Sequence, residues 1–276
     1  MSEHPVTPAV LPVGLPDRPG VTPVRVLRAE LGKAVALRST GWAVVVAVTV
    51  NAAIATFVAY QARYDLDSQP PSMLGLLTLA LVATQLPVLV LGVLVSAAEY
   101  PSGAARSTFL AVPRRRPVLA AQVLTVVVVA VLTAGAALAV TSLALLPFRA
   151  ELSLALDLSD PQTRRVLGGF VLYLVAVAVL GVALGTVTRT PAAGLVAGVG
   201  LVFLLEQVVP FLGAPWLLAT LPGWAGRLAA ESDAGAAERA AQAGVGLTPW
   251  LGLGVTAAWV GALLLTAAVR LRRSGV

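Results

Sequence analysis

Six apolar runs, each long enough to cross a lipid bilayer, dominate this sequence of 276 residues. Crossing about 30 Å of hydrocarbon takes roughly 20 helical residues, and helices satisfy their own backbone in lipid. With 58% hydrophobic and only 12% charged residues, the chain is too apolar for a soluble globular domain. The sequence therefore predicts an all-α integral membrane protein with six transmembrane helices, at residues 41–60, 74–98, 118–146, 166–187, 192–212 and 250–269.

The segments before the first run predict a tail and an interfacial helix. Residues 1–21 are rich in proline and glycine without an apolar period, which indicates a disordered cytoplasmic tail. Thr22 and Pro23 then fit an N-cap and a first helical position. Residues 22–40 predict an amphipathic helix along the inner leaflet. Its apolar face holds Val24, Leu27, Leu31, Ala34 and Val35, and its charged residues include Arg28, Glu30, Lys33 and Arg38. A transmembrane domain at 41–273 and a short tail at 274–276 complete the chain.

The distribution of charge predicts the orientation. With both termini in the cytoplasm, 13 of the 19 Lys and Arg residues lie on the inner side and 6 on the outer side. Such an excess is typical of cytoplasmic loops. The net charge of +6 therefore reports orientation, and no nucleic-acid partner is expected.

The loop between the second and third runs predicts a short cytoplasmic helix. Pro101 can open it and Pro113 can close it, and Ala105, Phe109 and Val112 form one apolar stripe between them. A helix of this kind either rests on lipid headgroups or docks into another protein. The candidate site residues of this loop, which would contact the headgroups or the other protein, are Glu99, Tyr100, Arg106, Phe109, Arg114, Arg115 and Arg116.

The connection before the last run contains an apolar part that is too short to span. Residues 213–224 carry two tryptophans and are interrupted by prolines, which predicts a re-entrant or interfacial element. We expect Trp216 and Trp224 at headgroup depth. Residues 227–242 are rich in alanine and charge, and predict a solvated helix or loop.

Four polar residues inside the runs are candidates for a translocation path: Asn51, Gln85, Glu206 and Gln207. Glu206 either lines a path or gate together with Gln207, or lies near the outer interface and reaches the headgroups. Asn51 and Gln85, like Thr84, can equally hydrogen-bond between helices. Pro87 predicts a kink in the second run.

The residue inventory excludes several kinds of chemistry. There is no cysteine, and the single histidine, His4, lies in the tail, so zinc proteolysis and a Ser-His nucleophile are not expected. No catalytic residue or metal site is predicted. The sequence also lacks a G-x-x-x-x-G-K-[ST] phosphate loop, so any ATP chemistry must come from another chain.

Three short stretches stand at the ends of the apolar runs. They are Arg28-Ala29-Glu30-Leu31-Gly32-Lys33 before the first, Glu99-Tyr100-Pro101-Ser102-Gly103 after the second, and Leu221-Pro222-Gly223 before the sixth. In sequence and in order, they resemble the membrane-spanning subunits of ABC transporters of the ABC-2 export type. The resemblance covers roughly residues 22–273.

The resemblance implies a permease subunit of an ATP-driven exporter, with the helix in 99–116 as its coupling helix. The expected partners are an ATP-binding cassette subunit, which would bind the ATP and Mg, a second copy or paralogue of the permease, and membrane lipids. The expected location is the plasma membrane of a bacterium, with several spans and both termini in the cytoplasm. A secondary transporter and a non-transporting membrane scaffold or sensor remain alternatives.

Overall fold

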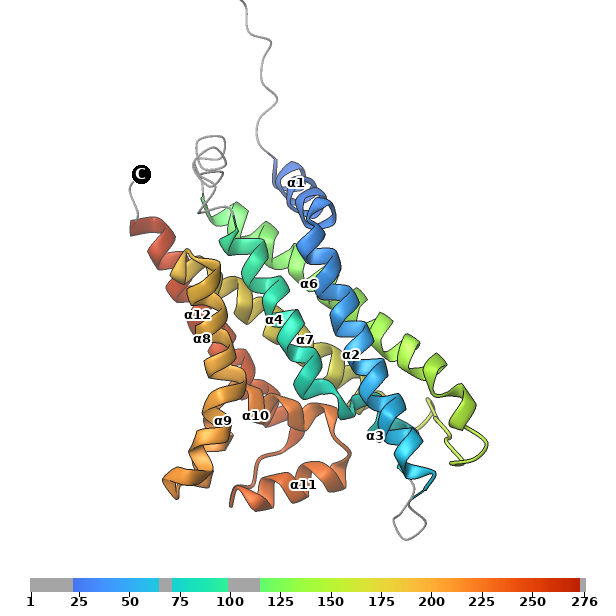
Figure 1. Cartoon of the computed structure of the whole chain (residues 1–276). Helices are drawn as coiled ribbons and strands as arrows, with labels where there is room; N and C mark the ends of the chain where they lie inside the picture. Colours follow the sequence, from blue (N-terminus) through green and yellow to red (C-terminus); the bar gives the residue numbers. More distant parts are fainter. Residues whose placement is uncertain (1–21, 65–70, 99–114, 274–276) are drawn as a thin grey trace, which may run out of the picture.

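The computed structural model describes residues 22–64, 71–98 and 115–273, and within these ranges the chain is helical, without a strand. Long helices run side by side, as Figure 1 shows. The beginning of α1 (Pro23–Ala36) and the end of α12 (Pro249–Arg273) lie at one end of the bundle, and α11 (Asp233–Gln242) lies at the other. The prediction of an all-helical membrane protein with several spans agrees with this architecture.

Five helical segments in the described part of the chain are long and apolar enough to cross a membrane. They are α2 (Arg38–Ala62), α6 (Arg115–Ala144), α7 (Pro161–Thr188), the run Pro191–Leu212 and α12. A sixth span exists if α3 (Met73–Leu79) and α4 (Leu81–Ala97) count as one, because this pair passes the same test together but is bent by 41°.

The break in the second run lies at Ala80, upstream of Pro87, where the sequence predicts a kink. The carbonyls in the last turn of a helix have no partner within that helix. One of them, at Leu77, accepts a hydrogen bond from Asn51 Nδ2 of α2 at 3.2 Å. A side chain from a neighbouring helix therefore compensates for the break.

The fifth run is continuous but irregular. It consists of α8 (Pro191–Val199), the π-helix η2 (Gly200–Leu204), α9 (Leu205–Val208) and the 3-10 helix η3 (Val209–Leu212). A π-turn widens the helix and changes the direction of the side chains after it. Glu206 lies in α9, directly after this turn.

The connection before the last span packs against other helices of the same chain. It forms η4 (Pro215–Thr220), α10 (Pro222–Arg227) and η5 (Leu228–Ala230), followed by α11. Every residue of α10 is buried. Thr256 of α12 donates a hydrogen bond to the Pro222 carbonyl at 2.8 Å, and a methyl group at Gly252 would lie 2.1 Å from the Ala225 carbonyl. The expected re-entrant element is thus covered by α12 and α7, and not by lipid alone.

The two tryptophans of this connection have different surroundings. Trp216 is 56% exposed, which is compatible with the expected headgroup position, whereas Trp224 is 6% exposed. Trp224 is therefore enclosed by protein and does not present its ring to the headgroups. Trp224 packs with Val209 and Leu228 in a cluster between α10 and the end of the fifth run.

Helix α7 is the centre of the bundle and contacts α4, α6 and α12. Its side chains Phe170, Tyr173 and Leu174 are fully buried. Gly92 of α4 faces it so closely that a methyl group there would lie 2.0 Å from the Ala178 carbonyl. Small residues thus allow α4 and α7 to approach each other.

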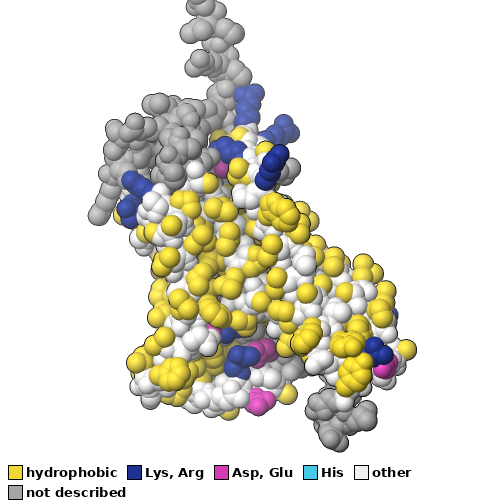
Figure 2. Space-filling model, viewed as in Figure 1, with side chains coloured by type: hydrophobic (Ala, Val, Ile, Leu, Met, Phe, Trp, Pro, Cys, Tyr) yellow, Lys and Arg dark blue, Asp and Glu magenta, His cyan; other side chains and the backbone are white. Residues whose placement is uncertain are grey.

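Helix α1 begins as predicted, with the Thr22 hydroxyl accepting from the Arg25 N–H. Val26, Glu30 and Ala34 of this helix are buried, while Val24, on the face expected to contact the inner leaflet, is 59% exposed. Val26 is buried because it packs against Val118 and Ala121 of α6, a helix of the same chain. Basic side chains gather around this end of the molecule (Figure 2).

Candidate functional site

A buried ion pair joins α9, in the fifth run, to the end of α10. Arg227 Nη2 donates to Glu206 Oε2 at 2.5 Å, and Nη1 donates to Oε1 at 3.2 Å. The two residues are only 5% and 6% exposed. The side-by-side geometry is the strong form of an arginine–carboxylate contact. It explains how both charges can lie inside the protein.

A glycine in α10 makes this contact possible. A methyl group at Gly223 would lie 2.1 Å from Glu206 Oε1 and 2.4 Å from the Val202 carbonyl. Only glycine therefore lets α10 approach the π-turn and α9 this closely. The Leu221-Pro222-Gly223 stretch thus positions Arg227, which ends the same helix.

Two further polar side chains extend this contact to α4 and α7. The Tyr173 hydroxyl donates to Gln85 Oε1, and Gln85 Nε2 donates to the Val202 carbonyl at 3.4 Å. Tyr173 also lies beside the Arg227 guanidinium. We call Glu206, Arg227, Tyr173 and Gln85 the buried polar cluster. It links four segments that lie far apart in the sequence.

The buried polar cluster holds two opposite charges in direct contact. The two charges cancel, and each is expensive to leave alone in an apolar environment. Separating α10 from α9 would therefore require water, a proton or a charged ligand to replace the lost partner. The arrangement therefore holds α10 against α9.

A second polar centre ties α2, α3, α4 and α6 together. Asn51 Nδ2 donates to Thr141 Oγ1 at 2.8 Å, in addition to its bond with the Leu77 carbonyl, and Asn51 Oδ1 accepts from Thr84 at 3.1 Å. Asn51, Thr84 and Thr141 are completely buried. The hydrogen bonds of Asn51 are thus satisfied by helix contacts.

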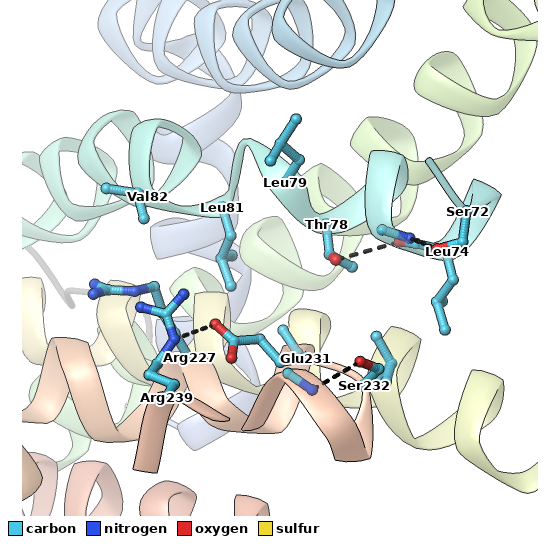
Figure 3. Close-up of a pocket in the computed structure, with 14 residues that line it drawn as sticks. Ser72, Leu74, Thr78, Leu79, Leu81, Val82, Arg227, Glu231, Ser232 and Arg239 are labelled. Carbon is cyan, nitrogen blue, oxygen red and sulfur yellow. Dashed lines mark hydrogen bonds and ion pairs between the residues drawn. The ribbon is translucent and has the colours of Figure 1, made fainter. Parts of the chain in front are cut away.

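A cavity of about 260 Å³ lies next to the buried polar cluster, at the end of the bundle opposite to α1. As Figure 3 shows, α3 and α4 form one wall, and α10 and α11 form the other. Arg227 lines it, together with Glu231 and Arg239, which form an ion pair with 2.6 Å between Arg239 Nε and Glu231 Oε1. A hollow with acidic and basic side chains is visible there in Figure 2.

The structure brings only some of the predicted site residues together. Glu206 and Gln85 share the buried polar cluster, while Asn51 belongs to the second centre and Gln207 is exposed. The Glu206 side chain does not reach towards headgroups, because it points at Arg227. The structure thus separates Gln207 from the carboxylate beside it in the sequence.

The other predicted residues lie towards the opposite end. In α1, Arg28 is exposed and Glu30 is buried, with Lys33 Nζ 2.7 Å from its carboxylate. Arg38, at the start of α2, is exposed. The predicted coupling helix lies outside the described residues, as does the tail at 1–21. This also applies to Glu99, Tyr100, Arg106, Phe109 and Arg114, whereas Arg115 and Arg116 begin α6.

The sequence interpretation misses Arg227, which it places in a solvated outer segment. A signal exists, because Arg227 follows Gly223, Trp224, Ala225 and Gly226, a run of small and apolar residues typical of close helix packing. In the described ranges, no group of three or more His, Cys, Asp or Glu side chains could hold a metal ion.

No protein-family model matches the sequence, and no curated protein matches it either. The similarity of three short stretches to ABC-2 permeases therefore stays an expectation drawn from the residues themselves.

Proposed function

We propose that this chain is the permease subunit of an ATP-driven exporter of the ABC-2 type. The observation that carries the proposal is the short buried helix before the last span, which begins at Pro222 and ends at Arg227. A broken segment at membrane depth is tolerated where protein covers it, and such segments are typical of transport proteins.

Two further features support the proposal. Arginines cluster between the second and third runs, where the resemblance places a coupling helix, and the sequence has no phosphate loop of its own. In this account a separate ATP-binding subunit binds ATP and Mg and moves the loop at 99–116. The movement is carried through α4 and α6 to the opposite end, where the buried polar cluster holds α10 closed.

The subunit is expected to work as a dimer, with a second copy or a paralogue, in a bacterial plasma membrane. Both termini would lie in the cytoplasm, on the side of α1, where basic side chains gather in Figure 2. The buried polar cluster and the cavity beside it would then lie towards the outer side.

Purification of the tagged chain from its native membrane tests this function. We expect an ATP-binding subunit to co-purify, together with ATPase activity. Replacement of Arg106, Arg114, Arg115 and Arg116 by alanine should remove both. Arg63, Arg149 and Arg164 are arginines of the opposite end, and their joint replacement by alanine is the matched control that should keep the complex. Retention of the ATPase by the first variant would contradict the proposed docking loop.

A secondary transporter is the second candidate, and the buried Glu206–Arg227 pair in an irregular span favours it. Ionisable groups at broken helices are typical of ion-coupled transport. A proton or sodium gradient across proteoliposomes that hold only this chain distinguishes the two. Gradient-driven uptake without ATP would favour the secondary transporter, and a need for a second subunit and ATP would favour the exporter.

A further inference from the structure

We propose that the cavity between α3–α4 and α10–α11 binds the acidic headgroup of a membrane amphiphile, with Arg239 as its principal ligand and the beginning of the acyl chain on the apolar wall. The headgroup chemistry is a carboxylate or a phosphate monoester. This inference goes beyond the proposed function, because it concerns a site within the chain and requires no ATPase partner.

The polar wall of the cavity is rich in donors. Arg239 Nε lies 2.6 Å from Glu231 Oε1, and within the described ranges no hydrogen bond involves the two terminal nitrogens of Arg239. The Arg227 side chain, 5% exposed, also lines the cavity, and its Nε has no hydrogen-bond partner in the described chain. Each guanidinium group is paired with a carboxylate, Arg227 with Glu206 and Arg239 with Glu231, yet each keeps N–H donors that no described residue uses and that an anionic oxygen can accept.

Two serine hydroxyls add to this donor set. Ser72 Oγ accepts from the Gly75 N–H at 3.0 Å, and Ser232 Oγ accepts from the Gly235 N–H at 3.2 Å. Both serines line the cavity, and each keeps its own hydroxyl hydrogen for a ligand. Carboxylate and phosphate oxygens accept such bonds.

The opposite wall is apolar and consists of Leu74, Leu79, Leu81, Val82 and Val166. Leu79 is 48% exposed, so this wall continues onto the outside of the bundle. The volume of about 260 Å³ is slightly smaller than the range of about 300–1,000 Å³ for sites that enclose a drug-sized ligand. It suits a headgroup and the beginning of a chain whose remainder lies along the protein surface.

The test uses the full chain in phosphatidylcholine vesicles with a trace of spin-labelled stearate at alkaline pH. Electron paramagnetic resonance measures the motionally restricted fraction, and spin-labelled phosphatidylcholine gives the reference for lipid that merely surrounds the protein. We expect restricted stearate to exceed that reference. Arg239→Gln should lower the association constant of stearate by up to about fivefold, the effect of one partly exposed ion pair.

A second variant has the opposite sign and therefore separates binding from misfolding. Glu231→Gln removes the carboxylate that competes for Arg239, so stearate association should rise. Arg164→Gln is the control, because Arg164 lies at the same end, bonds the carbonyls of Leu158 and Ser159, and does not line the cavity. It should leave the association unchanged.

Three results would overturn the proposal. Equal restriction of stearate and phosphatidylcholine would show that the cavity does not select an acidic headgroup. A decrease with both Arg239→Gln and Glu231→Gln would show that charge in the cavity is not the cause. Displacement of stearate by an excess of inorganic phosphate would identify a site for a free anion, without a role for the apolar wall.

Discussion

The guanidinium of Arg227 and the carboxylate of Glu206 lie side by side, with 2.5 Å between Nη2 and Oε2 and 3.2 Å between Nη1 and Oε1. This contact joins α9, near the end of the fifth run, to the end of α10. Neither residue is exposed enough for water to replace its partner. The stability of this end of the bundle should therefore depend on both charges being present together.

The first prediction concerns single and double replacement of this pair. Glu206→Leu leaves an arginine that cannot lose its charge, and should cost about 3–5 kcal/mol of unfolding free energy. Arg227→Met should cost less, because the remaining carboxyl can take up a proton. The double variant should be more stable than Glu206→Leu. Detergent-induced unfolding measures all three, and strictly additive losses would contradict the coupling.

Two adjacent glycines of α7 give a second prediction with an internal control. A methyl group at Gly169 would lie 2.0 Å from the Ala229 carbonyl of η5, whereas nothing lies within 4 Å of one at Gly168. Gly169→Ala should displace η5 and lower the melting temperature. Gly168→Ala should be neutral or stabilise α7 by up to about 1 kcal/mol. Equal melting temperatures for the two variants would argue against this packing.

Most of the helical framework could be predicted from the sequence. The runs at 41–60, 166–187 and 250–269 lie within α2, α7 and α12, because about 20 apolar residues in lipid leave the backbone few alternatives. The start of α1 at Pro23 is likewise confirmed, since its cap depends on neighbouring residues only.

Long-range pairing is the part that could not be predicted. The partner of Glu206 lies 21 residues further on, in a segment that looks like a solvated loop because it contains charges. The buried face of α1 depends on Val118 and Ala121, which no local pattern in α1 reveals. The bend at Ala80 lies beside a hydrogen bond from Asn51 of another helix to the Leu77 carbonyl, a contact that the local sequence does not reveal.

The third prediction tests the centre around Asn51. Asn51→Leu keeps the volume but leaves the Leu77 carbonyl without a side-chain donor, and should cost about 1–3 kcal/mol. Thr84→Val should cost only about 0.6 kcal/mol, which is typical of a single hydrogen bond between membrane helices. Unfolding of the purified chain in mixed micelles measures the unfolding free energy of both variants. An equal loss for both would contradict the central position of Asn51 in this hydrogen-bond network.

The fourth prediction concerns acid stability. The backbone N–H and the hydroxyl of Thr163 both donate to Asp160, the N-cap of α7, and keep the pKa of this carboxyl below its ordinary 3.8. A lowered folded-state pKa means that the cap stabilises α7 above pH 3.8, and that this stabilisation is lost as the pH falls through the lowered value.

Melting temperatures of Asp160→Ala and Asp160→Asn measure this contribution. The deficit of the alanine variant relative to the native chain should be constant near neutral pH and shrink on acidification. Asparagine keeps a capping oxygen without a charge, so it should retain part of the stability at every pH. A deficit of the alanine variant that grows in acid would have the wrong sign.

The most direct test of the central claim, coupling to a separate ATPase, is cross-linking from a single cysteine in native membranes. The chain has no cysteine, so Ser107→Cys in the predicted coupling helix and Ser159→Cys at the other end each carry one reactive thiol. We predict that a thiol-specific photo-cross-linker attached to Cys at 107 captures a protein with a G-x-x-x-x-G-K-[ST] phosphate loop, and that the control at 159 does not. Capture of such a subunit from neither position, or equally from both, would contradict the permease assignment.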